Sequence, residues 1–172
     1  MPPAILRTAN AAIYNGRVTI AIDLPDEAAT AVLAGRIATQ VRAGDIIALR
    51  GDLGVGKTSF ARAFIRARGA IGEDVPSPTF TLVQTYEPGG TSIWHFDLYR
   101  LGRAEEAWEL GIEEAFTEGI SLIEWPERLG ALLPPGHLEI AFSFGERPQA
   151  RRAVCEGGRE WQTRLAALAD HV

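Results

Sequence analysis

Cysteine is almost absent from this sequence, because Cys155 is the only one among 172 residues. A single thiol allows neither an internal disulfide nor a zinc cage built from cysteines. Long hydrophobic runs are missing too: the run 46–49 is far below the roughly 20 residues that span a membrane. The N-terminus has no charged start followed by an apolar stretch, so no secretory signal is predicted. A cytoplasmic location without membrane attachment is therefore expected.

Basic residues are also in the minority, with 17 Lys and Arg against 22 Asp and Glu and a formal net charge of −5. Proteins that bind nucleic acid by themselves usually carry a basic excess. We therefore expect no tight binding of nucleic acid by this chain alone. The acids concentrate between residues 103 and 128, where eight Glu face two Arg. This segment is either a solvated helix face or a docking surface for a basic partner.

The remaining composition, 47% hydrophobic and 23% charged residues, is typical of a globular protein with one core. We expect one domain over residues 1–172. Apolar periodicity and turn residues predict an alternation of strands and helices. Strands are expected at 17–22, 46–49, 79–86, 92–97, 120–123, 137–144 and 150–155, helices at 25–41, 57–68 and 105–116, and either element at 160–169. This alternation predicts an α/β fold with a largely parallel sheet.

The strongest motif is the pattern G-x-x-x-x-G-K-[ST] at residues 51–58, here called the phosphate loop. It reads Gly51, Asp52, Leu53, Gly54, Val55, Gly56, Lys57 and Thr58. Its glycines allow backbone N–H groups to turn inward around an anion, and the helix that follows adds the positive end of its dipole. Lys57 can reach the β- and γ-phosphates, and the Thr58 hydroxyl can hold Mg²⁺. The loop lies between a predicted buried strand and a predicted helix, which is the context that the motif requires.

Two acids follow predicted strands and are candidates for the same site. Asp97 ends the strand 92–97, and Glu124 follows the strand 120–123. Mg²⁺ bound to a nucleotide needs carboxylate support, and the attacking water must be oriented. Ser77, Pro78 and Thr79 lie between the loop helix and Asp97, where they form either a rigid turn or a switch that senses the γ-phosphate.

Three further residues near these acids have open roles. His95 is either a base or an ordinary histidine of the core or the surface whose hydrogen bonds are satisfied. Arg100 either neutralises phosphate charge or pairs with an acid. Trp125 is either part of the core or an aromatic cover beside the site.

Two other nucleotide-dependent activities can be weighed. Guanine-specific switches use an Asn-Lys-x-Asp segment, but the only asparagines, Asn10 and Asn15, precede the phosphate loop. This absence favours ATP over GTP. A small-molecule kinase with a phosphate loop remains the alternative, because Arg147, Arg151 and Arg152 could belong to a lid. A nucleotide-dependent scaffold, in which turnover only resets a docking surface, is also compatible.

Four motifs in this order resemble the TsaE family, also called YjeE, of small bacterial ATPases. They are the phosphate loop and the segments 77–83, 95–100 and 122–126. The resemblance extends from about residue 24 to residue 145. It implies a P-loop NTPase-like fold of three layers, with a central, mostly parallel sheet flanked by helices. The implied function is hydrolysis of Mg-ATP, slow without partners, that drives or resets a complex of TsaB and TsaD. This hydrolysis is required for formation of the threonylcarbamoyl group on adenosine 37 of tRNA, but the chain itself carries out no chemistry on the tRNA.

The resemblance also assigns site residues. Lys57 and Thr58 would hold phosphate and Mg²⁺, Glu124 would be the metal-linked acid, and Asp97 would be the acid needed for hydrolysis. The segment Ser77 to Thr81 would be switch-like, Trp125 would flank the site, and Glu27 would lie near the nucleotide base. Residues 1–22 depart from the family and are expected to form an added N-terminal strand. A family Gly-Arg pair near the nucleotide has three competing counterparts, Arg147, Arg151 and Arg152.

Overall fold

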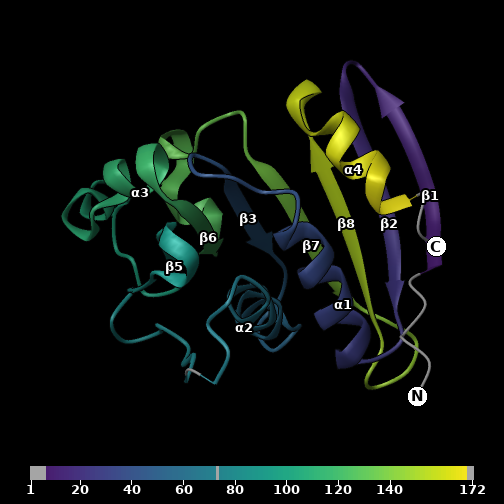
Figure 1. Ribbon diagram of the computed structural model, residues 1–172, viewed down its shortest axis with the longest axis horizontal. Coiled ribbons are helices and arrows are strands. Elements are labelled where there is room, and N and C mark those ends of the chain that lie inside the picture. The colour runs from purple at the N-terminus through teal and green to yellow at the C-terminus, as the bar shows by residue number, and fades with distance from the viewer. Residues whose placement is uncertain (1–6, 73, 170–172) are drawn as a thin grey trace.

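The protein is described by a computed structural model that covers residues 7–72 and 74–169. Eight strands belong to one sheet, and helices lie on both of its faces (Figure 1). The strands are β1 (Arg7–Tyr14), β2 (Arg17–Leu24), β3 (Ile46–Arg50), β4 (Val83–Tyr86), β5 (Ile93–Asp97), β6 (Ile120–Glu124), β7 (Leu138–Phe144) and β8 (Arg151–Gly157). The α-helices are α1 (Glu27–Ala38), α2 (Lys57–Ala67), α3 (Ile112–Glu118) and α4 (Gln162–Ala169). Short 3₁₀ helices are η1 (Pro88–Gly90), η2 (Ala104–Leu110), η3 (Pro126–Leu132) and η4 (Arg159–Trp161).

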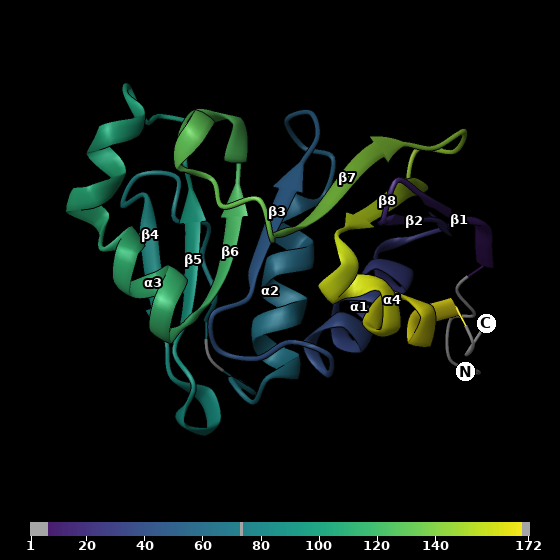
Figure 2. The same cartoon turned by 90° about the horizontal axis from the view of Figure 1, so that it is seen from above.

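The strand order is β1-β2-β8-β7-β3-β6-β5-β4, which Figure 2 shows from β1 at one end to β4 at the other. The four central strands β7, β3, β6 and β5 run parallel to one another. The outer strands pair antiparallel: β4 with β5 on one side, and β8, β2 and β1 on the other. The prediction of an α/β fold with a parallel centre flanked by helices is confirmed, and the flanks make the whole sheet mixed.

Alternating side chains of the central strands feed two hydrophobic clusters on opposite faces of the sheet. Ile47 and Leu49 of β3 pack in one cluster with side chains of α1, α2 and α4. Ile46 of the same strand, with Phe96 and Ile123, packs in the other cluster with η2, α3 and η3. The central strands are therefore buried on both faces, which explains why β3 and β6 are continuous apolar runs in the sequence.

Two predicted elements differ from the structure. The strand expected at 79–86 begins only at Val83, because the chain before it folds into a turn. There the Leu82 N–H donates to the Pro78 carbonyl at 2.6 Å, and Leu82 has a φ of +66°. The helix expected at 105–116 is divided into η2 and α3 by Gly111, whose φ of +79° interrupts regular helix.

Other elements lie where the sequence places them. The helix that starts after Pro25 is capped by Asp26, whose side chain accepts a hydrogen bond from the Ala29 N–H at 2.9 Å. The open choice at 160–169 is decided in favour of helix, as η4 and α4. Of the predicted addition 1–22, residues 1–6 lie outside the described residues, and the rest form β1 and most of β2. None of the described helices is long and apolar enough to cross a bilayer.

Candidate active site

The phosphate loop connects the carboxyl end of β3 to the first residue of α2. Gly51 has a φ of +133°, and a Cβ atom at this position would lie 2.6 Å from the Phe142 carbonyl oxygen of β7. Gly54 and Gly56 also have positive φ values, of +75° and +114°. These angles are costly for residues with a side chain, so the loop needs its glycines. The predicted strand, loop and helix are thus brought together as the motif requires.

Lys57 is buried at the start of α2, with 4% of its surface exposed. Its Nζ donates to the carbonyl oxygens of Gly51 at 2.5 Å and Asp52 at 2.9 Å, so the side chain folds back across the loop. Burial lowers the pKa of Lys57 below its usual value, and the Glu124 carboxylate opposes this shift. A buried ammonium held by neutral carbonyls has a strong electrostatic reason to accept an anion.

Thr58 and Glu124 meet across the gap between α2 and β6. The Thr58 hydroxyl lies 2.9 Å from each carboxylate oxygen of Glu124, to which it donates. Glu124 is 2% exposed and pairs in register with Leu49 of β3. The parallel pairing of β3 and β6 therefore places this acid beside the phosphate loop.

Asp97 pairs in register with Glu124 on the neighbouring strand and is 4% exposed. Its Oδ2 accepts hydrogen bonds from the hydroxyls of Thr79 at 2.8 Å and Ser77 at 3.3 Å. Its Oδ1 accepts from the Tyr99 N–H at 3.2 Å. Pro78 is buried between the two hydroxyl residues. The predicted switch segment and the predicted hydrolytic acid are thus in direct contact.

Trp125 lies over the ammonium of Lys57, with the ring centre 4.0 Å from Nζ. Its φ of +59° is unusual for a bulky residue and occurs directly after Glu124, where η3 begins. The Tyr99 ring lies 5.0 Å from the Trp125 ring. The structure therefore places Trp125 beside the phosphate loop. The guanidinium carbon of Arg100 lies over the Phe80 ring, 4.4 Å from the ring centre.

Glu27 lines a cleft of about 450 Å³ with Gly54, Val55 and Gly56. The cleft is also lined by Gln149, in the turn between β7 and β8, and by Arg151 at the start of β8. The structure thus brings Glu27, at the first turn of α1, to the same cleft as the glycines of the phosphate loop. Asp52 and Leu53 are exposed at the tip of the loop.

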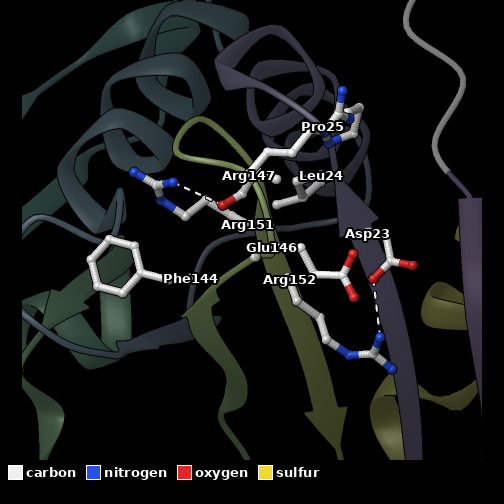
Figure 3. A pocket seen from close by; sticks show the side chains of 10 residues that line it. Asp23, Leu24, Pro25, Phe144, Glu146, Arg147, Arg151 and Arg152 are labelled. Atoms are coloured by element: carbon white, nitrogen blue, oxygen red, sulfur yellow. Dashed lines mark hydrogen bonds and ion pairs between the residues drawn. The ribbon is translucent and has the colours of Figure 1, made fainter.

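The three late arginines have different surroundings. Arg151 donates from Nε to the Val55 carbonyl of the phosphate loop at 2.8 Å. Arg152 donates to Asp23 at 3.0 Å. Figure 3 shows that the side chains of Arg151 and Arg152 leave β8 in different directions. Arg147 lines a neighbouring cleft of about 930 Å³ together with Glu146 and both other arginines. Arg151 therefore bonds the phosphate loop itself and also lines the cleft of Glu27.

The oxygen atoms of this site suit Mg²⁺ bound to a nucleotide. Within the described part of the chain, no group of three His, Cys, Asp or Glu side chains could hold a metal ion by itself. Mg²⁺ in nucleotide sites usually takes one or two protein oxygens and completes its shell with water and phosphate oxygens. The Thr58 hydroxyl beside the Glu124 carboxylate is such a pair.

Sequence reasoning left two contacts of the site unassigned. Nε2 of His95 lies 2.8 Å from Oε1 of Glu124, and Arg151 donates a hydrogen bond to the phosphate loop. The two-residue period of a strand already places His95 on the same face as Asp97, but its contact with Glu124 depends on the pairing of β5 with β6. The second contact had no signal in the sequence, because Arg151 is 96 residues from Val55.

Comparisons with known proteins agree with this arrangement. Residues 24–154 match the family model described as "Threonylcarbamoyl adenosine biosynthesis protein TsaE". The tRNA threonylcarbamoyladenosine biosynthesis protein TsaE of Rickettsia felis is 44% identical over 117 residues, which cover 68% of each chain. The protein of the same name from Bacillus subtilis is 38% identical over 148 residues, covering 86% of this chain and 90% of the other.

A solved structure resembles the whole fold. The crystal structure of YdiB from Bacillus subtilis superposes with a TM-score of 0.75 at 26% sequence identity, covering 89% of this chain and 95% of YdiB. The P-loop NTPase-like architecture that the sequence predicts is consistent with this match. Together with the family model, these relatives show that the chain belongs to the TsaE family of tRNA threonylcarbamoyladenosine biosynthesis proteins.

Proposed function

We propose that this chain, residues 1–172 acting as one domain, binds and hydrolyses Mg-ATP to support formation of the threonylcarbamoyl group on adenosine 37 of tRNA. The observation that carries the proposal is the contact between Thr58 and Glu124. It joins the phosphate loop, which would bind the nucleotide, to a buried acid that can support a metal ion. This acid lies at the carboxyl end of β6, the parallel neighbour of β3. A crevice at the carboxyl ends of parallel strands is where open α/β sheets bind ligands.

Nucleotide binding is the first step of this proposal. Backbone N–H groups of residues 51–56 and the first turn of α2 face the phosphates. Lys57 exchanges its carbonyl partners for the β- and γ-phosphate oxygens, with Trp125 covering its ammonium. Glu27 lies in the cleft next to the loop glycines, on the side where the nucleoside would extend.

Hydrolysis requires that charge be neutralised and that a water be oriented. Thr58 and Glu124 would hold Mg²⁺, which neutralises the charge that develops on the phosphate oxygens. Asp97 would orient the attacking water. Its Oδ2 is bonded to Ser77 and Thr79, so these hydroxyls must shift before that oxygen can accept from water. This exchange would couple the segment 77–79 to the γ-phosphate.

The proposed role in tRNA modification implies that the hydrolysis acts within an assembly of proteins. We propose that turnover, slow in the isolated chain, drives or resets a complex of TsaB and TsaD. The family name and the net charge of −5 support a chain that acts on protein partners and does not bind tRNA tightly by itself. Adding these partners should raise ATP turnover. Salt-sensitive tRNA binding by the chain alone would contradict the second half of this proposal.

The variant Asp97→Ala tests the catalytic assignment. We expect ATP affinity within about threefold of the unchanged protein and a turnover rate reduced about 100-fold or more, because losing one residue that stabilises or orients the reacting groups typically costs 10²–10³ in rate. Binding is measured by calorimetry and turnover by phosphate release. Asp23→Asn is the matched control, since Asp23 is an exposed acid of β2. Undiminished turnover in the Asp97→Ala protein would remove Asp97 from the mechanism.

Phosphate release without an added acceptor also separates the hydrolase from the alternative, a small-molecule kinase. Two of the arginines considered for a kinase lid are already held by hydrogen bonds to the rest of the chain. Arg151 donates to the Val55 carbonyl, and Arg152 donates to the Asp23 carboxylate. The hydrolase is therefore the better supported function.

A further inference from the structure

His95 is a fully buried polar side chain in the central strand β5, with 0% of its surface exposed. Its Nε2 lies 2.8 Å from Oε1 of Glu124 on the neighbouring strand β6. In the sheet register His95 is opposite Leu122 and Asp97 is opposite Glu124. The imidazole therefore reaches Glu124 along the diagonal of one sheet face, the same face from which Asp97 projects.

The hydrogen of this imidazole can be assigned from its surroundings. Among the described residues, Nδ1 of His95 is buried and has no hydrogen-bond partner. A buried nitrogen that bears hydrogen and lacks a partner is costlier than a buried acceptor that lacks one. Nε2 is therefore the atom that bears hydrogen, and it donates to the carboxylate, while Nδ1 bears none.

A histidine at this point has a cost that core packing does not explain. Burying a polar ring without satisfying both nitrogens is unfavourable, and the buried residues Ile93 and Leu122, which lie on the same face of the sheet, are apolar. An apolar side chain would fill the space without leaving a nitrogen unpaired. The gain that offsets this cost is the bond to Glu124.

We propose that His95 is a positioning residue, which acts through Glu124. Its Nε2–H fixes one carboxylate oxygen, so that the carboxylate keeps its plane toward the Thr58 hydroxyl. Thr58 donates its single hydrogen to the same carboxylate, which leaves the lone pairs of its oxygen for a cation. Outer-shell partners of metal ligands commonly fix ligand orientation in this way. The inference rests on the proposed function of Mg-ATP binding and assigns a residue to it.

The two variants His95→Gln and His95→Asn distinguish this role from simple packing. The amide nitrogen of a glutamine can occupy the position of Nε2 and donate to Glu124, whereas the shorter asparagine places its amide near the position of Nδ1. The Mg²⁺ concentration that half-maximally tightens ATP binding is measured by calorimetry. We expect it to rise about 10–100-fold in the His95→Asn protein, the usual loss when an outer-shell partner is removed, and less than about tenfold in the His95→Gln protein.

Ser121→Ala is the matched control. Ser121 is a fully buried polar residue of β6 whose hydroxyl donates to the Ala115 carbonyl, away from Glu124. The substitution should lower the unfolding temperature and leave the Mg²⁺ dependence unchanged. Equal Mg²⁺ dependence in the His95→Gln and His95→Asn proteins would overturn the positioning role. Absence of Mg²⁺-dependent ATP binding in the unchanged protein would instead contradict the proposed function.

A second measurement needs no substitution of His95. Nitrogen-15 shifts of the imidazole ring in the unchanged protein distinguish a nitrogen that bears hydrogen from one that does not. The His137→Gln protein helps to assign the signals. We expect hydrogen on Nε2 of His95 and none on Nδ1. Hydrogen on Nδ1 alone would make Glu124 the donor and would overturn the inference.

Discussion

Polar side chains are buried in the parallel centre of the sheet, whereas those in its antiparallel flank are exposed to solvent. In the centre, His95 is buried in the middle of β5, and Asp97 and Glu124 are buried at the ends of β5 and β6, on the side of the buried Lys57. In the flank of β1, β2 and β8, charged side chains form exposed ion pairs, such as the pair of Arg152 with Asp23. The sheet is continuous, so the difference arises from strand direction and from what covers each strand.

Strand direction explains this contrast physically. Parallel neighbours end at the same edge, so the residues that follow β3, β5 and β6 converge on one point. Antiparallel neighbours end at opposite edges, and their terminal residues are separated by the length of a strand. The flank therefore extends and covers the sheet, while the centre assembles a site. Arg151 links the flank to the site, because it lies on β8 and bonds the phosphate loop.

The largest effect is expected in the centre, from Lys57→Met. ATP affinity should fall at least about 100-fold, because hydrogen bonds to charged groups contribute about 1.5–3 kcal/mol each and Lys57 would make several to phosphate.

The same variant tests how stability depends on pH. The pKa of Lys57 is lowered by burial, so the folded chain binds this proton less tightly than the unfolded chain. The free energy of unfolding then rises with pH between the lowered pKa and the ordinary lysine pKa of about 10.4, and the Lys57→Met substitution should abolish this rise.

The ATP affinity is measured by calorimetry with Mg-ATP. The pH dependence of stability is measured by thermal unfolding between pH 7 and about pH 10, because the predicted rise in stability ends near the ordinary lysine pKa. ATP binding that survives in the Lys57→Met protein would break the assignment of the site to the centre. If the stability of the unchanged protein relative to the Lys57→Met protein fell as the pH rises, this result would contradict the direction of the pKa shift.

An intermediate effect is expected where the flank meets the centre, from Arg151→Gln. The loss of one hydrogen bond to the Val55 carbonyl should weaken ATP binding about 3–10-fold, as expected for about 0.5–1.5 kcal/mol. The turnover rate at saturating ATP should change less than the affinity, because the contact shapes the loop and does not reach Asp97. A turnover rate that falls while affinity stays constant would show that Arg151 acts at the acids instead.

The smallest effect is expected within the flank, from Arg152→Gln. The ion pair with Asp23 is exposed, and such pairs contribute about 0–1 kcal/mol to stability. ATP affinity should be unchanged. Arg151 and Arg152 are adjacent in the sequence, so this variant is also the control for Arg151→Gln. Equal losses of ATP affinity in the two proteins would mean that the flank takes part in binding as a whole.

The acidic segment 103–128 shows how far a charge pattern alone can be interpreted. Most of its glutamates are exposed on η2, α3 and η3, which agrees with a solvated face. Glu124 differs, because it is buried and bonded to Thr58 and His95. A count of charges along the chain does not separate these two kinds of glutamate, since burial depends on which strand lies next to which.

The sequence by itself determined the local elements and the phosphate loop. Gly51, Gly56, Lys57 and Thr58 form a motif within eight residues, and the pattern of a strand before it and a helix after it depends only on near neighbours. The positions of Asp97 and Glu124 after apolar runs also followed from local periodicity. The sequence missed the turn at residues 79–82, where bonds from Thr79 to Asp97 and from Leu82 to Pro78 replace an extended strand.

Only the tertiary structure decided which of these residues meet. Glu124 lies beside Thr58 because β6 pairs with β3, a contact across 66 residues of sequence. His95 reaches Glu124 through the pairing of β5 with β6, and Arg151 reaches Val55 because β8 lies next to β7. Strand order is set by the burial of whole faces against helices, which is a property of the assembled core and not of any segment. The chemistry was therefore present in the sequence as separate residues, and the parallel centre of the sheet made them one site.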